Sequence, residues 1–341
     1  MNKLVAVLAV IAILALGLSV WLSQSSIKGK FEAELLFADL AEFANQVDRV
    51  EITNAQGVLF SAQKLGDSWL ATFDPEQPVY PVSQEKLADF VKTLMRVKLV
   101  ETKTRKPQNY ARLGLKSIDH EDSMASFVSL NAAGKSWQVL VGNKVSIGEG
   151  HYILKPENAQ SWRTDKTIHL PFDRFAWLKQ PILPFQAQDI SSVSRVDSLE
   201  WQITRGSSGD FQLSNMPKGR ELEYASILNS IVSNLTNLDF EELLKADEDF
   251  TQSLTVLTQL EVSTTDQEIF QLVVSALDGK HFVSFSAREK SKYWQKWHYQ
   301  ISHFSAQQLI KTMDDFLVEQ SSITNDDEKK PQAIDEGDAP S

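Results

Sequence analysis

A continuous apolar run at the N-terminus is the feature that most limits how this chain can fold. It extends from Leu4 to Leu22, and Ser19 is its one weakly polar member. As a helix, these 19 residues would span about 28 Å, close to the ~30 Å hydrocarbon thickness of a bilayer. The run exceeds the ~7–15 apolar residues typical of a cleaved secretory signal. With Trp21 as an interfacial aromatic, residues 1–26 are expected to form an uncleaved signal anchor, a single transmembrane helix; a cleaved signal is the alternative.

The charges on either side of this run indicate where the rest of the chain lies. Lys3 and the terminal amine favour a cytoplasmic N-terminus, whereas Lys28 and Lys30 favour the reverse. A short tail before a first hydrophobic segment usually stays inside the cell. The expected location is therefore the inner (cytoplasmic) membrane, crossed once, with the bulk of the chain extracytoplasmic, which means periplasmic in a bacterium.

Composition excludes several classes of protein. The 341 residues include no cysteine, which excludes disulfides, cysteine-ligated zinc, iron–sulfur clusters and thiol catalysis. The net charge is −11, from 34 basic and 45 acidic side chains, whereas a nucleic-acid binder needs a basic face. A hydrophobic fraction of 42% is ample for a globular core, and the length predicts two domains or one duplicated unit.

The first half of the chain combines strand patterns with helix patterns. Its main helix, which Ser83 can cap, has an apolar stripe at Leu87, Phe90, Val91, Leu94 and Val97. Two further helical segments are expected at 31–45 and 172–178. Strand patterns cover 50–53, 59–64, 68–72, 127–130, 137–141, 151–154 and 162–163. These elements predict a first α+β module over residues 31–180.

The second half follows a boundary at 180–184, where two prolines oppose any continuing element. A strong amphipathic helix is expected at 224–238, and a last helix begins at a capping box, Ser305-Ala306-Gln307-Gln308, and extends to Leu317. Strand patterns cover 199–203, 211–213, 254–262, 269–277, 281–286 and 297–301. These elements predict a second α+β module over residues 185–320.

The two modules show the same order of elements, which suggests an internal repeat. Val47-Asp48-Arg49-Val50 recurs as Val193-Ser194-Arg195-Val196, and Trp69 and Leu87 match Phe211 and Ile227 at similar offsets. The shared order predicts a duplicated module, each copy a mainly antiparallel sheet packed by helices. Two unrelated α+β domains that both begin with a hairpin and a helix are the alternative.

The last 21 residues, 321–341, differ in composition from the rest. They are rich in Asp and Glu, and Ile323 and Ile334 are their only large apolar residues. Such a segment buries too little surface to offset its chain entropy, so we expect a disordered acidic tail, with an interaction role as the alternative.

None of the motifs that carry common chemistry is complete. Gly142-Asn143-Lys144 lacks the upstream glycine and the hydroxyl residue of a phosphate-binding loop. Gly206-Ser207-Ser208-Gly209 lies between two strand patterns and is typical of a hairpin loop rather than a nucleophile turn. Asp119-His120-Glu121-Asp122 lacks the paired His of a zinc helix. We therefore expect no enzyme, catalytic residue, metal or cofactor; a hydrolase whose carboxylates come from distant positions is an alternative.

One aromatic cluster is a candidate binding surface. Most tryptophans occupy core-facing positions of strand or helix patterns, whereas the segment 293–299 concentrates aromatic side chains in a short stretch. These side chains can form a stacking platform for glycan or envelope polymer, or else pack as a hairpin edge. The candidate surface residues are Tyr293, Trp294, Trp297 and Tyr299.

The segment from Leu36 to Leu115 contains a distinctive series of short motifs after the N-terminal anchor. In order, they are Leu36-Phe37, Val47-x-x-Val50-x-Ile52, Gly57, Gly66-Asp67-x-Trp69, Tyr80-Pro81-Val82, Val100-Glu101-Thr102 and Asn109-Tyr110-Ala111-Arg112-Leu113-Gly114-Leu115. In these motifs the segment resembles an uncharacterised family of domain-of-unknown-function proteins encoded beside gliding-motility-type ABC transporters. The resemblance is good over the first module and weak over the second. It implies an anchored, extracytoplasmic α+β protein working beside an ATP-driven membrane complex, and it supplies no catalytic residues.

The expected function is therefore that of a non-enzymatic accessory or scaffold protein of an ABC-type transport system. Its partners would be the membrane permease and ATPase subunits of that system, because this chain has no nucleotide-binding loop of its own. The alternative is an anchored module that binds glycan or envelope polymer through the 293–299 aromatics.

Overall fold

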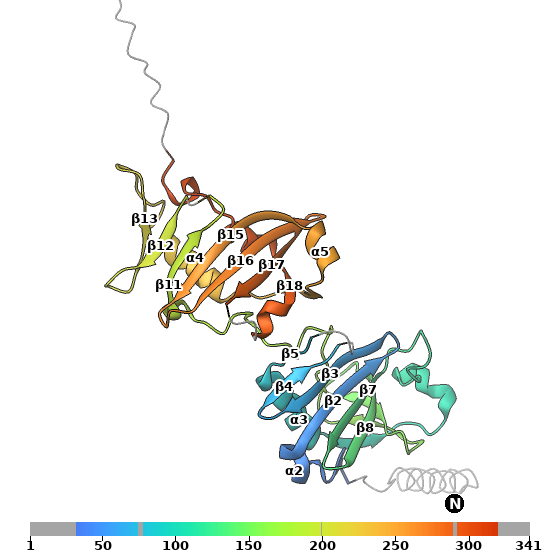
Figure 1. Ribbon diagram of the computed structural model, residues 1–341. Helices are drawn as coiled ribbons and strands as arrows, with labels where there is room; N and C mark the ends of the chain where they lie inside the picture. The colour runs from blue at the N-terminus through green and yellow to red at the C-terminus, as the bar shows by residue number, and fades with distance from the viewer. Residues whose placement is uncertain (1–31, 74–77, 199, 289–291, 320–341) are drawn as a thin grey trace, which may run out of the picture. The chain divides into compact units, whose positions relative to one another are not determined.

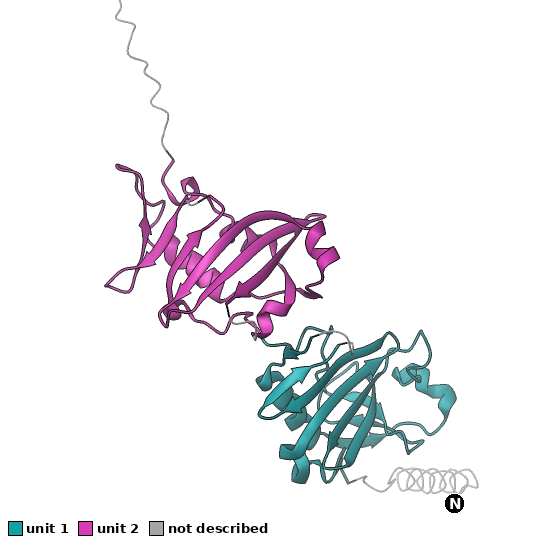
Figure 2. Cartoon of the chain, in the orientation of Figure 1, with its two compact units in different colours: residues 1–179 teal, residues 180–341 magenta. Residues whose placement is uncertain are grey.

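The computed structural model describes residues 32–73, 78–198, 200–288 and 292–319 (Figure 1). The predicted signal anchor at 1–26 and the predicted acidic tail at 321–341 lie outside these ranges. Within them, no helix is both long enough and apolar enough to cross a bilayer. The chain divides into two compact units, residues 1–179 and residues 180–341 (Figure 2).

Unit 1 is built on a ten-stranded antiparallel sheet in the order β1-β6-β10-β9-β8-β7-β2-β3-β4-β5. Its helical segments are α2 (Leu40–Phe43), η1 (Ala44–Gln46), α3 (Gln84–Arg96) and η2 (Pro107–Leu113). Its strands are β1 (Glu34–Leu35), β2 (Val47–Asn54), β3 (Gly57–Leu65), β4 (Ser68–Ala71), β5 (Tyr80–Pro81), β6 (Lys98–Thr102), β7 (Ser126–Ala132), β8 (Lys135–Lys144), β9 (His151–Leu154) and β10 (Ser161–Thr164).

Unit 2 is built on an eight-stranded antiparallel sheet in the order β13-β12-β11-β15-β16-β17-β18-β14, and α4 lies across one face of it (Figure 1). Its helical segments are η3 (Ala187–Asp189), α4 (Ile227–Thr236), α5 (Glu248–Ser253), η4 (Tyr293–Lys296), α6 (His303–Leu309) and η5 (Asp314–Phe316). Its strands are β11 (Ile190–Arg195), β12 (Gln202–Arg205), β13 (Phe211–Ser214), β14 (Glu242–Lys245), β15 (Thr255–Thr264), β16 (Ile269–Leu277), β17 (Lys280–Ala287) and β18 (Trp297–Ile301). The two sheets with few helices confirm the predicted α+β class.

The sequence patterns explain most of these elements. In β15, buried residues alternate with less buried ones, as expected for a strand that buries one face. The buried residues are Thr258, Leu260, Val262 and Thr264. In α3, Leu87, Phe90 and Leu94 are buried, and the Ser83 hydroxyl accepts a hydrogen bond from the Lys86 backbone N–H at 3.4 Å. The predicted cap and the predicted stripe of this helix are both confirmed.

The two units repeat one topology. Eight strands of unit 1 follow the order β6-β10-β9-β8-β7-β2-β3-β4, and the eight strands of unit 2 follow the same order from β14 to β13. In chain order, the longest helix of each unit connects the two end strands of this series. Helix α3 lies between β4 and β6, and α4 lies between β13 and β14. The repetition extends to the last residues of each unit. An isolated antiparallel bridge joins Val82 to Leu178 in unit 1, and another joins Leu222 to Leu317 in unit 2.

The strand register corrects one alignment drawn from the sequence. Val50 pairs with Ala62 of β3, and Val193 pairs with Ile203 of β12 at the corresponding position. Val193 therefore corresponds to Val50, and Ile190 corresponds to Val47. The similar tetrapeptides at 47–50 and 193–196 are thus out of register by three residues, because strand position is set by cross-strand pairing rather than by local composition.

Three helix predictions also differ from the structure. The segment 31–45 contains β1, in which Glu34 pairs with Leu99, followed by the four-residue helix α2 and the start of η1. The segment 172–178 forms turns rather than a helix: the Leu178 N–H donates to the Phe175 carbonyl at 2.9 Å, and the Trp177 carbonyl accepts from the Ser83 N–H at 2.8 Å. The last helix begins at His303 and ends at Leu309, rather than running from 305 to 317.

Candidate functional site

A groove in unit 1 lies between helix α3 and the sheet, and its lining combines apolar and charged side chains. It has a volume of about 550 Å³, within the range of ligand pockets of ~300–1,000 Å³. Helix α3 forms one wall with Leu87, Val91 and Met95. The opposite wall comes from the sheet, through Val47 of β2, Lys64 of β3 and Trp69 of β4.

The groove is present because the apolar face of α3 is broader than the part of that face that the sheet covers. Val91 and Met95 are one turn apart and only half-buried, and Trp69 is half-buried opposite them. Charged groups stand at the rim: Asp67 is exposed, and the Lys92 ammonium pairs with the Asp89 carboxylate at 3.3 Å. Such a surface suits a side chain with an apolar stem and a polar tip.

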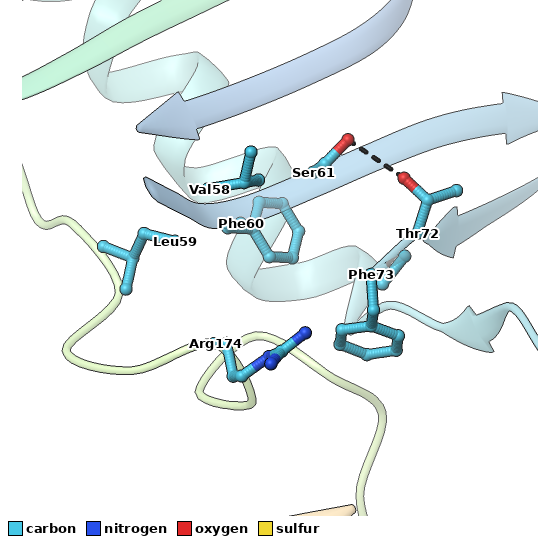
Figure 3. Close-up of a pocket in the computed structure, with 8 residues that line it drawn as sticks. Val58, Leu59, Phe60, Ser61, Thr72, Phe73 and Arg174 are labelled. Atoms are coloured by element: carbon cyan, nitrogen blue, oxygen red, sulfur yellow. Dashed lines mark hydrogen bonds between the residues drawn. The ribbon is translucent and has the colours of Figure 1, made fainter. Parts of the chain in front are cut away.

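A second recess in unit 1 is much smaller (Figure 3). It lies among Phe60, Phe73 and Arg174, and it has room for about 10 Å³, which is one water molecule. The Arg174 guanidinium lies 5.1 Å from the centre of the Phe73 ring, and the Thr72 hydroxyl donates to the Ser61 hydroxyl at 3.0 Å (Figure 3). This recess is too small for a substrate.

Unit 2 carries a polar recess of about 370 Å³ between the β15–β16 turn and the end of β17. Its lining includes Glu268, Arg288 and Lys292, and the Lys292 ammonium lies 3.2 Å from the Glu268 carboxylate. Because this carboxylate and ammonium neutralise each other, the recess presents no strong net charge from that pair.

The aromatic cluster predicted as a binding surface lies inside unit 2. Trp294 and Tyr299 have no exposed surface, and Trp297 is 1% exposed. Trp294 packs against Phe270 and Phe285, with ring centres 5.6 Å and 5.7 Å away. The prediction of a platform is therefore wrong for these three residues, because they are buried in the core, where Trp294 and Tyr299 contact aromatic rings of the sheet.

The fourth residue of that cluster, Tyr293, is half-buried. Its hydroxyl donates a hydrogen bond to the Ile182 carbonyl at 2.8 Å, and burial raises the pKa of Tyr293 to about 12. The side chain therefore remains a neutral donor at physiological pH, and it fixes the start of unit 2 rather than presenting a stacking face.

Two histidines of unit 2 have pKa values lowered by their surroundings. Burial lowers the pKa of His298, against a smaller opposing effect of Asp247, and its Nε2 lies 2.8 Å from the Thr251 hydroxyl. Burial and then His303 lower the pKa of His281, and these two rings are 5.0 Å apart. In the part of the chain that the structure describes, no three His, Asp or Glu side chains gather as metal ligands.

Comparison with protein families identifies the chain. The family model described as Domain of unknown function (DUF4340) matches residues 69–255, more than half of the chain. This protein belongs to the DUF4340 family. No curated protein and no solved structure matches it. The DUF4340 match begins at Trp69, on the wall of the groove, includes the whole of α3, and continues through α4 and α5 of unit 2.

The sequence identified parts of the groove but not the groove itself. Local patterns correctly predict Trp69 in a hairpin and Val91 in the apolar stripe of α3, but they do not predict that the two residues line one groove. The one available signal was Met95, an apolar residue outside the predicted stripe, which widens the apolar face of α3 beyond what a single contact can cover.

Proposed function

We propose that this DUF4340 protein is a non-enzymatic, membrane-anchored, extracytoplasmic accessory or scaffold protein of an ABC-type transport system. The groove of unit 1 carries the proposal, because its half-buried Trp69, Val91 and Met95 offer an apolar contact surface that a partner could cover. Partner-binding surfaces combine such apolar anchors with a charged rim.

The membrane part of the proposal rests on the apolar run from Leu4 to Leu22, long enough to span a bilayer as a helix. The transporter part rests on the resemblance of residues 36–115 to proteins encoded beside ABC transporters. The proposed location is the inner membrane, crossed once, and the proposed partners are a permease and an ATPase subunit.

The test is affinity purification of the full chain from detergent-solubilised membranes after mild cross-linking, with mass spectrometry of the proteins recovered. We expect a permease and an ATPase with the wild-type chain. Met95→Lys places a charge in the groove and should lower recovery about tenfold or more. Met124→Lys is the matched control, because Met124 is 78% exposed and lies outside the groove.

Two outcomes would contradict the proposal. Purification of the wild-type chain without any permease or ATPase would remove the transporter role. Equal loss of partners in both methionine variants would show that the groove is not the contact surface.

A further inference from the structure

The two units allow a direct comparison of the groove with its counterpart. Lys64 of β3 pairs with Trp69 of β4, and Arg205 of β12 pairs with Phe211 of β13 at the same register position. An aromatic ring and a basic side chain therefore stand opposite each other in both units, at the same place in the repeated topology.

In unit 2, the Arg205 side chain fills this place. Its guanidinium lies 4.4 Å from the centre of the Phe211 ring. Its Nε donates to the Ile190 carbonyl at 2.9 Å, its Nη1 to the Gly209 carbonyl at 2.7 Å, and its Nη2 to the Ala187 carbonyl. The planar guanidinium thus links η3, the start of β11 and the β12–β13 hairpin. Arginine is the side chain whose several N–H donors have a fixed, forked geometry suited to such a link.

Unit 1 has counterparts of two of the three receiving carbonyls, those of Ala187 and Ile190; its β3–β4 connection, Gly66-Asp67, is too short to contain a counterpart of Gly209. Val47 corresponds to Ile190, and the Val47 N–H bonds to the Ala44 carbonyl just as the Ile190 N–H bonds to the Ala187 carbonyl. Both strands have a register irregularity directly after this residue. Each of these carbonyls has a second lone pair, which Arg205 uses on Ala187 in unit 2.

The two sites differ in what occupies them. Unit 1 has Lys64 in place of Arg205, and a lysine cannot bridge several carbonyls with a planar fork. The α4 helix packs directly against η3 and β13 and buries Leu228 and Val232. At the corresponding turns of α3, Ala88 and Lys92 are exposed and line the open groove.

We propose that the groove of unit 1 binds an arginine side chain supplied by a partner protein, in the position that Arg205 occupies in unit 2. The guanidinium would lie over Trp69 and donate to the Ala44 and Val47 carbonyls, while the aliphatic stem contacts Val91. This inference deepens the proposed function, and it rests on that function only for the identity of the partner.

Charged side chains at the rim act on an incoming cation in opposite ways. Asp67 attracts it, and the Lys92 ammonium is paired with the Asp89 carboxylate at 3.3 Å. Lys64 opposes it with a like charge unless its flexible stem moves to the solvent. Removal of the Lys64 charge should therefore strengthen binding of arginine, whereas an arginine at position 64 should close the groove from within.

The probe is the peptide acetyl-Ala-Arg-Ala-amide, titrated into the full chain in detergent micelles with methyl-¹³C methionine labelling. The chain has five methionines, of which Met95 lines the groove, and Met95→Leu assigns its signal. We expect the Met95 signal to shift while those of Met124 and Met313 do not. The citrulline peptide, which has the same shape without the charge, should bind about tenfold more weakly.

Three variants sharpen the test. Lys64→Arg should abolish the peptide-dependent shift, Lys64→Gln should lower the dissociation constant, and Trp69→Leu should raise it. An unshifted Met95 signal at tens of millimolar peptide would overturn the inference. So would equal binding of the citrulline peptide, which indicates a purely apolar groove, or unchanged binding by Lys64→Arg. Because no transporter subunit is present, these results are independent of the purification that tests the proposed function.

Discussion

At the scale of single residues, Lys64 of unit 1 and Arg205 of unit 2 occupy the same register position, and Arg205 fills its place with a network of hydrogen bonds. Arg205 is anchored by backbone carbonyls of Ala187, Ile190 and Gly209 and by the face of Phe211. Charged donors make stronger hydrogen bonds than neutral ones, so one such side chain ties a helix, a strand and a hairpin together.

Arg205→Lys should destabilise unit 2 by about 2–3 kcal/mol, because an ammonium replaces a fork that bonds three carbonyls. The free energy of unfolding from urea titration, followed by hydrogen exchange in unit 2, measures this loss. Arg49→Lys, at an exposed position of β2, is the control and should change stability by less than about 0.5 kcal/mol. Equal effects of the two changes would argue against the bridging role.

His298 should make the stability of unit 2 depend on pH. Burial lowers the pKa of His298 from its ordinary 6.5, so the unfolded chain takes up this proton more readily than the folded one. The contribution of neutral His298 to the free energy of unfolding is fully present above pH 6.5. It is lost as the pH falls from 6.5 towards the lower pKa of the folded state. Urea midpoints at pH 8 and pH 5 should therefore differ less in His298→Gln than in the wild type, and an unchanged difference would refute this role.

At the scale of elements, helix ends depend on caps that local sequence does not always distinguish. The sequence suggests a capping box at Ser305, whereas α6 begins at His303 with Ser302 as its cap. The Ser302 hydroxyl accepts from the Ser305 N–H at 3.1 Å. Serine is a preferred N-cap residue, so both positions are suitable by composition. The cap in the structure is Ser302, which directly follows the end of β18 at Ile301.

Ser302→Ala should cost about 1 kcal/mol of stability in unit 2, the usual loss for an N-cap. Ser305→Ala should cost less than about 0.5 kcal/mol, because it leaves the Ser302 hydroxyl in place to accept from the helix backbone. Thermal unfolding of the two variants, with hydrogen exchange over 303–309, distinguishes them. A larger loss in Ser305→Ala would place the helix start where the sequence suggests it.

At the scale of the whole molecule, the chain comprises two compact units with one topology. Each has its own buried core: Leu130 of β7 and Val274 of β16 have no exposed surface in their respective sheets. Domains with separate cores usually unfold as separate cooperative units.

Leu130→Ala should lower the unfolding free energy of unit 1 by about 3 kcal/mol and leave unit 2 unchanged. Val274→Ala should lower that of unit 2 alone, by a smaller amount because it removes fewer methyl groups. Hydrogen exchange with mass spectrometry in increasing urea reports each unit separately. A single transition that both variants shift together would show that the units unfold as one.

Much of the fold could be predicted from the sequence because its patterns are local. The apolar stripe of α3 and the alternation in β15 follow from the 3.6- and 2-residue periods of helix and strand. The groove could not be predicted, because its walls, Trp69 and Val91, belong to different elements whose spacing depends on packing.

Local patterns in the sequence predict the long strands, the Ser83 cap of α3 and the shared order of elements, but they miss β1, β5, β6, β11 and β14. The tertiary structure alone decided the register that matches Val50 with Val193, the burial of Trp294 and the open groove beside Lys64. The physical reason is range: periodicity is set by neighbouring residues, whereas burial and register depend on pairings between residues far apart in the chain.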